Sequence, residues 1–149
     1  MAAKFLLIFF ALFGFAFSEV IPFIDRGDYS VCEINKLRIT PCKNQTHCTL
    51  KKGSTVRISF DFTPKFSSDS IMTGLLWYNE GFKNSYSELP NADGCLYTPC
   101  PLEADKKQTL NYDLQIANRL PDGEYNFKWK IWTHTDEECY FETTIELER

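Results

Sequence analysis

The chain has 149 residues, and its 16 Lys and Arg against 20 Asp and Glu give a formal net charge of −4. Proteins bind nucleic acids largely by neutralising phosphates, so an acidic chain without a Lys/Arg cluster is expected to have no nucleic-acid partner. The chain also lacks a basic helix that would bind an anionic membrane surface. Its length fits one domain of ordinary size.

The N-terminal residues predict an export signal. Lys4 is positively charged, residues 5–17 are apolar or small, and Ala16-Phe17-Ser18 supplies small residues where signal peptidase needs them. The apolar run is shorter than the about 20 residues that span a bilayer. We therefore predict a signal peptide at residues 1–18 and a mature domain at residues 19–149. The expected location is extracellular rather than the lysosomal lumen.

Alternation of apolar and polar residues along the mature chain predicts β-strands. In chain order, these strands are residues 34–40, 56–63, 110–116, 125–131 and 139–148. Residues 70–78 are apolar on both faces, so they predict a strand but do not indicate which of its faces points inward.

Turn signals separate these runs, at Lys52-Gly53, at Pro64, and at residues 79–81, 90–94 and 121–123. No stretch keeps apolar residues at helical spacing over three turns, so little or no helix is expected. Six or seven antiparallel strands, most with one apolar face, predict an all-β fold. The expected architecture is an immunoglobulin-like sandwich of two antiparallel sheets.

All six cysteines lie in the mature domain. An even number in a secreted chain predicts disulfides. The short spacings suggest the local pairs Cys42–Cys48 and Cys95–Cys100, which leave Cys32–Cys139 to tie the two ends of the domain together. Neither spacing is the Cys-x2-Cys of a zinc site, so no metal is expected.

A glycosylation sequon, Asn44-Gln45-Thr46, lies between Cys42 and Cys48. A short surface loop tolerates a glycan, so Asn44 is the predicted glycosylation site.

The residue patterns of common enzymes are missing from the sequence. The two histidines, His47 and His134, have neither a Gly-x-Ser-x-Gly elbow nor a His-Glu-x-x-His motif near them. Residues 136–138 are acidic, but adjacent side chains on a strand or tight turn point apart, so a solvated edge is favoured over a calcium site. We expect a binding protein without cofactor and not an enzyme.

Three blocks of sequence around the cysteines resemble the ML lipid-recognition domain. They are Ile39-Thr40-Pro41-Cys42 with Cys48, then Asp93-Gly94-Cys95 with Cys100-Pro101-Leu102, and finally Trp129 with Cys139 and Tyr140. The resemblance extends to secreted relatives of the soluble Niemann-Pick type C sterol carrier, including arthropod members. It implies two sheets that splay around an apolar cavity, and disulfides that join the first cysteine to the sixth, the second to the third and the fourth to the fifth.

The start of the domain departs from the family pattern. The family often has its first cysteine in Phe-x-Asp-Cys-Gly, whereas this chain has Phe23-Ile24-Asp25-Arg26-Gly27 and its first cysteine at Cys32. The expected bridge remains Cys32–Cys139, because free thiols are rare in an oxidising compartment.

The resemblance also implies which residues contact a ligand. Ile116 and Leu120 match family pocket positions on either side of a turn, with Leu120 where the family has an aromatic residue. Tyr86 is the nearest match to a third, aromatic position, and Phe82 is its rival. The full set of ligand-binding residues expected is Phe60, Phe62, Tyr86, Tyr112, Leu114, Ile116, Leu120, Phe127 and Trp129. Alternation alone favours a solid core for the inward aromatic residues; the resemblance favours a cavity.

The function implied is that of a secreted carrier, which holds one apolar ligand between its sheets. The ligand would be a fatty acid, a sterol or a semiochemical-like lipid, delivered to a membrane or receptor acceptor by a monomer. The alternative is a secreted lipid-recognition module that presents its bound lipid to a receptor in innate immunity.

Overall fold

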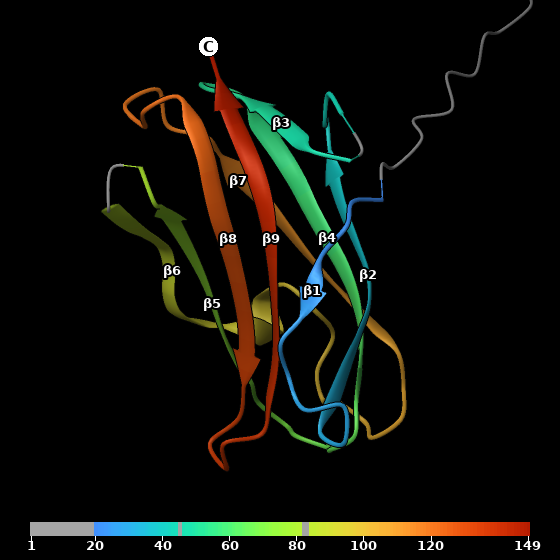
Figure 1. Cartoon of the computed structure of the whole chain (residues 1–149). Helices are drawn as coiled ribbons and strands as arrows, with labels where there is room; N and C mark the ends of the chain where they lie inside the picture. The colour runs from blue at the N-terminus through green and yellow to red at the C-terminus, as the bar shows by residue number, and fades with distance from the viewer. Residues whose placement is uncertain (1–19, 45, 82–83) are drawn as a thin grey trace, which may run out of the picture.

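The computed structural model describes residues 20–44, 46–81 and 84–149, and the predicted signal peptide lies outside these residues. The described residues form two β-sheets packed face to face (Figure 1). The larger sheet contains β1 (Ile24–Asp25), β9 (Glu138–Glu148), β8 (Gly123–Trp132), β5 (Met72–Asn79) and β6 (Asn84–Asp93) in that order, with β3 (Cys48–Lys51) also paired to β9. The smaller sheet contains β2 (Cys32–Thr40), β4 (Thr55–Pro64) and β7 (Gln108–Gln115). The predicted two-sheet sandwich is therefore confirmed.

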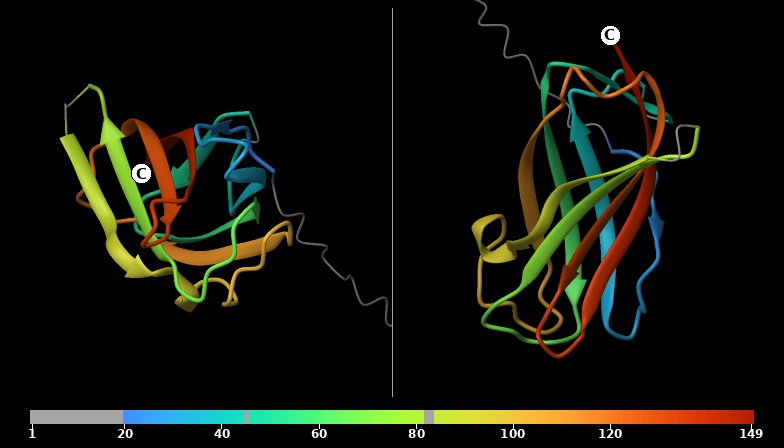
Figure 2. Two further views of the ribbon diagram at one scale, coloured as in Figure 1. Left: turned by 90° about the horizontal axis from the view of Figure 1, so that it is seen from below. Right: turned by 90° about the vertical axis from the view of Figure 1, so that its left-hand side faces the viewer.

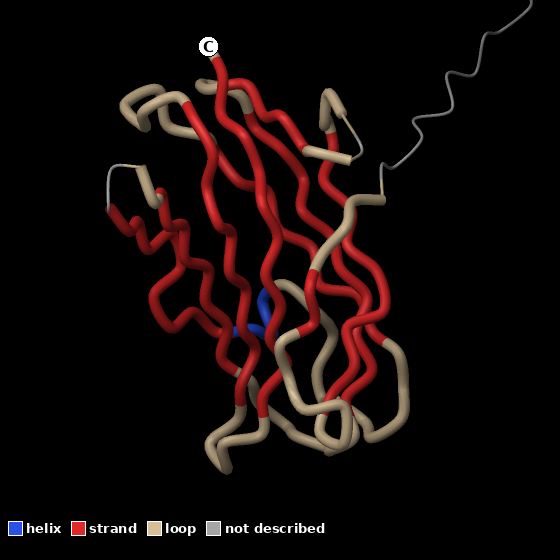
Figure 3. Tube along the Cα trace, viewed as in Figure 1, coloured by secondary structure: helices blue, strands red, loops and turns tan. Residues whose placement is uncertain are grey.

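The six predicted strands all form, at β2, β4, β5, β7, β8 and β9 (Figure 3). Their apolar positions face the space between the sheets, because burial on one face and solvation on the other fix the register of a strand. In β4, for example, Val56, Ile58, Phe60 and Phe62 are buried. The one short helical segment described is the 3-10 turn η1 (Gly94–Leu96).

Three strands were not predicted. β1 and β3 are short pieces that pair with β9, and β3 runs parallel to it, so the otherwise antiparallel large sheet contains one parallel pair. The turn predicted at residues 90–94 is also wrong in part, because residues 90–93 are the end of β6. β6 is an edge strand with irregular pairing to β5, and an edge strand tolerates Pro90 and the positive φ of Asn91.

The ladder between β5 and β8 settles the inner face of β5. Leu75 pairs with Trp129, and Trp77 pairs with Phe127. Directly opposite residues in a ladder share a face, so Leu75 and Trp77 point into the sandwich together with Thr73. All three are buried, whereas Leu76 between them is 38% exposed.

The two sheets are joined along one side, which we call the seam. The disulfide Cys32–Cys139 links β2 to β9, with a Cα–Cα distance of 5.3 Å. Nearby, the Ile21 amide donates to the Leu37 carbonyl at 3.0 Å and the Ile34 amide donates to the Asp25 carboxylate at 2.9 Å. The seam therefore fixes β2 against β1 and β9. The other two disulfides are Cys42–Cys48 and Cys95–Cys100, so all three expected pairs form.

Losing the disulfide of the seam should cost far more stability than losing a local one. In the loop-entropy account the cost grows with the length of the closed loop, and Cys32 and Cys139 are 107 residues apart in sequence whereas Cys95 and Cys100 are 5 apart. Replacing Cys32 and Cys139 with Ser should lower the free energy of unfolding by about 5 kcal/mol, against about 2 kcal/mol for Cys95 and Cys100. Urea unfolding of the two double variants measures both values. Equal losses would contradict this account.

An ion pair joins the three strands of the small sheet on its outer face. The Arg38 guanidinium on β2 donates two hydrogen bonds to the Asp61 carboxylate on β4, and the Thr109 hydroxyl on β7 donates a third at 2.8 Å. The hydrogen bonds from Arg38 are the main cause that lowers the pKa of Asp61, with a further contribution from Thr109. A carboxylate stabilised in this way contributes to folding only while it is ionised.

Acid should therefore weaken the wild type more than Asp61→Asn. The folded pKa of Asp61 lies below the unfolded value of about 4, so its contribution is complete above that pH and is lost as the pH falls toward the folded pKa. Urea midpoints measured between about pH 6 and 2 should converge for the two proteins at the acid end. Asp69→Asn, at an exposed position, is the control for the substitution itself. Parallel curves for wild type and Asp61→Asn would refute the prediction.

Candidate ligand-binding site

The edge of the sandwich opposite the seam is formed by β6 of the large sheet and β7 of the small one. Seen from below, β5 and β6 extend away from the side that carries β1 and β2 (Figure 2). Within the described residues no hydrogen-bonded ladder joins β6 to β7. The segment after η1 covers part of this edge, where the Asn111 amide donates to the Tyr97 carbonyl at 2.9 Å. The remaining edge is closed by side chains alone.

Half-buried aromatic residues line this edge. Together with Glu88 we call them the mouth: Tyr86, Tyr97 and Tyr112. Tyr97 and Tyr112 meet edge to face with ring centroids 5.3 Å apart, and Tyr112 also contacts Trp129 at 5.5 Å. On the β6 side, the Tyr86 ring lies 6.3 Å from that of Tyr125. Such contacts are weak and between side chains, so the mouth can open without breaking a ladder between strands, although Tyr97 is also held to β7 by the hydrogen bond from the Asn111 amide.

The carboxylate of Glu88 acts on Tyr112 of the mouth. Burial and the Glu88 carboxylate raise the pKa of the Tyr112 phenol, with a smaller contribution from Tyr97. Burial is likewise the main cause that raises the pKa of Tyr125. Both phenols are therefore neutral at ordinary pH, and Glu88 supplies the charge at this place.

The structure brings the nine predicted ligand-binding residues into one region between the sheets. Tyr86 and Tyr112 are at the mouth, and Leu120 is buried in the loop that follows β7. The other six are each no more than 1% exposed: Phe60, Phe62, Leu114, Ile116, Phe127 and Trp129. Phe82, the rival of Tyr86, lies outside the described residues. Whether these side chains contact a ligand stays a proposal.

The interior aromatic residues pack against one another across the two layers. Phe60 of the small sheet lies 5.4 Å from Trp129 and 5.0 Å from Phe141 of the large sheet, measured between ring centroids. None of the nine residues lines any of five hollows on the surface formed by residues 20–44, 46–81 and 84–149. A ligand between the sheets would therefore occupy space that opens when interior side chains move. It would not occupy one of these hollows.

Three further interior residues belong to this region but were not predicted as part of the site. Trp77, Tyr125 and Phe141 are each no more than 2% exposed, and Trp77 contacts both Tyr125 and Phe127 edge to face. Alternation had identified Tyr125 and Phe141 as inward strand positions. Trp77 gave no such signal because residues 70–78 are apolar on both faces.

Two hollows lie on the outer face of the large sheet. One, of about 530 Å³, is lined by both apolar and charged residues, among them Phe23, His47 and Glu142. The other, of about 490 Å³, is lined by Leu76, Trp132 and Tyr140 together with Lys128 and Lys130.

The described residues contain no group of three or more His, Cys, Asp or Glu side chains that could hold a metal ion. His47 lies 3.7 Å from Glu146 and 3.9 Å from Glu124, and the His134 ring nitrogen lies 3.3 Å from the Ser70 hydroxyl. In the same part of the chain, no helix is long and apolar enough to cross a membrane.

The fold and the site define a disulfide-bonded β-sandwich with an apolar interior, joined by a disulfide along one edge and without a strand ladder between the sheets along the other. The sequence matches the ML domain over residues 25–144. It is 39% identical, over the whole of both chains, to an MD-2-related lipid-recognition protein of Manduca sexta. The chain therefore belongs to the ML domain family, as the resemblance implied.

One further protein is similar in sequence, and one solved structure is similar in fold. The mite group 2 allergen Tyr p 2 of Tyrophagus putrescentiae is 26% identical over 78% of this chain and 79% of its own. Among solved structures, a Niemann-Pick type C2 protein from Japanese carpenter ant has the same fold. It superposes with a TM-score of 0.73 at 16% identity, over 86% of this chain and all of that one.

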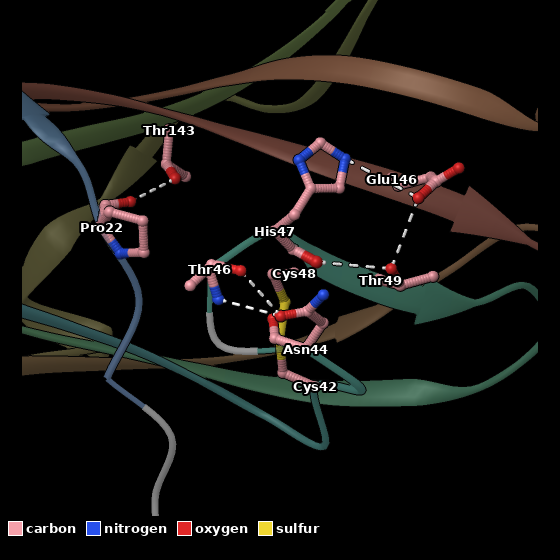
Figure 4. Close-up of a disulfide and its surroundings, with 9 residues drawn as sticks. All are labelled: Pro22, Cys42, Asn44, Thr46, His47, Cys48, Thr49, Thr143 and Glu146. Carbon is pink, nitrogen blue, oxygen red and sulfur yellow. Dashed lines mark hydrogen bonds and ion pairs between the residues drawn. A yellow bond between two sulfur atoms is a disulfide. The ribbon is translucent and has the colours of Figure 1, made fainter.

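The sequon lies in an exposed loop held by the disulfide Cys42–Cys48 (Figure 4). The Asn44 side-chain carbonyl accepts hydrogen bonds from the Thr46 amide at 3.1 Å and from the Thr46 hydroxyl at 2.9 Å. Gln45 between them lies outside the described residues. Asn44 and Thr46 are both exposed, which leaves the asparagine accessible to a glycosyltransferase.

Asn44 should carry a glycan when the chain is made in a eukaryotic secretory host, because it is exposed within the sequon. Intact mass before and after peptide N-glycosidase treatment measures this. Asn44→Gln and Thr46→Ala should both abolish the mass difference, since each destroys the sequon. The contrary result would be a wild-type mass unchanged by the enzyme.

Proposed function

We propose that this chain is a secreted carrier that binds one apolar lipid non-covalently between its two sheets, with removal of residues 1–18 on export. The observation that supports this proposal most directly is that the two edges of the sandwich are held together differently. At the seam a disulfide links β2 to β9, and hydrogen bonds join β2 to Ile21 and Asp25, whereas the mouth is closed by side-chain contacts and the backbone hydrogen bond from Asn111 to Tyr97. A ligand can therefore enter between β6 and β7 while the rest of the fold stays intact.

Transfer of apolar surface from water supplies the binding energy. Each buried methylene contributes about 0.8 kcal/mol, so an acyl chain or a sterol gains on the order of 10 kcal/mol before the cost of immobilisation. The interior offers Phe60, Phe127 and Trp129 as contact surface. No covalent step, metal or cofactor takes part, and the proposal is for a binding protein rather than an enzyme.

A second function, presentation of the bound lipid to a receptor, is favoured by the outer hollow beside Leu76. This side chain is 38% exposed on the face that does not contact the interior, next to Trp132 and Tyr140. Leu76→Lys separates the two functions. In a carrier it leaves lipid binding and delivery unchanged, whereas in a presenting module it leaves lipid binding unchanged and abolishes the response of the receptor.

A carboxylate at the mouth should weaken lipid binding. Tyr112→Asp places a charge where an apolar ligand would pass or lie, beside Glu88, and an unpaired charge near an apolar surface is costly. We expect the affinity for an uncharged fluorescent lipid probe to fall by about tenfold or more, since about 1.4 kcal/mol corresponds to tenfold. Tyr112 is half-buried, so the variant can keep its fold with the new charge turned toward water.

Asn111→Asp is the matched control. Asn111 is the preceding residue on β7, is exposed, and points to the outer face. It introduces the same charge on the same strand and should leave probe binding unchanged. Circular dichroism verifies that both variants fold. If folded Tyr112→Asp binds the probe as the wild type does, the ligand does not pass this edge.

A further inference from the structure

Two tryptophans buried in the interior of the sandwich differ in whether their indole N–H has a hydrogen-bond acceptor. The Trp129 indole N–H donates to the Thr73 hydroxyl at 2.7 Å, and the Thr73 hydroxyl in turn donates to the Lys130 carbonyl at 3.0 Å. The Tyr125 hydroxyl donates to the Pro121 carbonyl at 2.9 Å. Among the described residues, the two buried side-chain polar atoms without a partner are the indole nitrogen of Trp77 and the hydroxyl of Thr98.

Trp77 lies where a ligand of the proposed kind would be held, and the inference below rests on that proposed function. Its side chain is 2% exposed, points inward from β5, and meets Phe127 and Tyr125 edge to face at centroid distances of 5.2 and 6.0 Å. In the ladder with β6 it stands opposite Tyr86 of the mouth. A buried N–H without an acceptor costs free energy that an acceptor on a ligand would recover.

The surroundings indicate which acceptor fits. The buried polar residues of the described chain are threonines and one asparagine, so no buried cation is available there to pair with an anion. Lys52 has a side chain only 9% exposed, but it already pairs with Asp122 and donates to the Leu120 carbonyl. Glu88 adds negative charge at the mouth. A carboxylate taken into this interior would be desolvated without a counter-ion, which is strongly unfavourable.

We infer that Trp77 is the polar anchor of the site, and that its indole N–H donates to an uncharged oxygen of the ligand. The ligand class is thus a lipid with one neutral oxygen group, such as an alcohol, a carbonyl or an ester, on an otherwise apolar body. The apolar body lies among the aromatic residues between the sheets. Fatty-acid anions are the disfavoured class.

Ligands with the same chain and different end groups test this assignment. The probes are cis-9-octadecen-1-ol, methyl oleate, oleate and 1-octadecene, each measured by displacement of an apolar fluorescent probe from the mature protein at neutral pH. The wild type should bind the alcohol and the ester about tenfold more tightly than the hydrocarbon, since one hydrogen bond is gained. Oleate should bind more weakly than the alcohol.

Trp77→Phe removes the donor and should abolish the preference of the alcohol and ester over the hydrocarbon. Trp129→Phe is the matched control, because the Trp129 N–H is already paired with Thr73. This variant can weaken the binding of all four ligands together but should keep the preference for the alcohol and ester. Should Trp77→Phe fail to fold, 3-benzothienylalanine at position 77 keeps the shape of the indole and lacks only the N–H. On the wild type, the indole N–H proton resonance of Trp77 should move downfield with the alcohol and not with the hydrocarbon.

The outcomes separate the two proposals. If the lipids bind but the preference for a neutral oxygen survives the loss of the Trp77 N–H, or if oleate binds more tightly than the alcohol, the role of Trp77 is wrong and the carrier function stands. If none of the four compounds displaces the probe from the wild type, the carrier function itself is overturned and the role of Trp77 with it.

Discussion

The seam between β2 and β9 makes the two edges of the sandwich mechanically different. Cys32–Cys139 and the hydrogen bonds around it hold the sheets together on one side, so any separation of the layers must increase with distance from that side. The space gained by such a movement is greatest beneath β5, β6 and β7. The proposed ligand would therefore be accommodated where Tyr86 and Tyr112 close the edge, with the strands at the seam left undisturbed.

This geometry reconciles the packed interior with a role in ligand binding. Protein interiors are close-packed, and an apolar cavity left empty is costly because its lining loses contacts. Phe60, Trp129 and Phe141 fill the middle of the sandwich with ring contacts across the layers. A ligand that displaces these rings needs only to make contacts as favourable as those that are lost. It gains free energy in addition because its own apolar surface is buried. The side chains and the ligand are thus alternative fillings of the same space.

The sequence predicted the strands that have one buried and one solvent-exposed face. The prediction failed for strands in which the two faces differ little in polarity. β4 and β8 alternate cleanly because one face of each is solvated, so residues such as Phe60 and Phe127 were placed inside correctly. β5 is apolar on both faces, since Leu76 lines an outer hollow, and alternation could not choose the face of Trp77. β6 pairs on one edge only and accommodates Pro90, so it has no periodic signal. The missed part of the candidate site, Trp77 and Glu88, lies on these two strands.

The contrast between Trp77 and Trp129 bears on how a carrier of the proposed kind would release its ligand. Both indoles are buried between the same sheets, yet only Trp129 has its N–H satisfied within the described chain. Unpaired buried donors are rare in native structures because they lower stability, and they concentrate at functional sites. A single neutral hydrogen bond orients a ligand while adding only about 1 kcal/mol of net stabilisation, far less than the gross gain from burying an acyl chain. One indole N–H can thus select the end group and fix its direction without making the complex too stable for a carrier to unload.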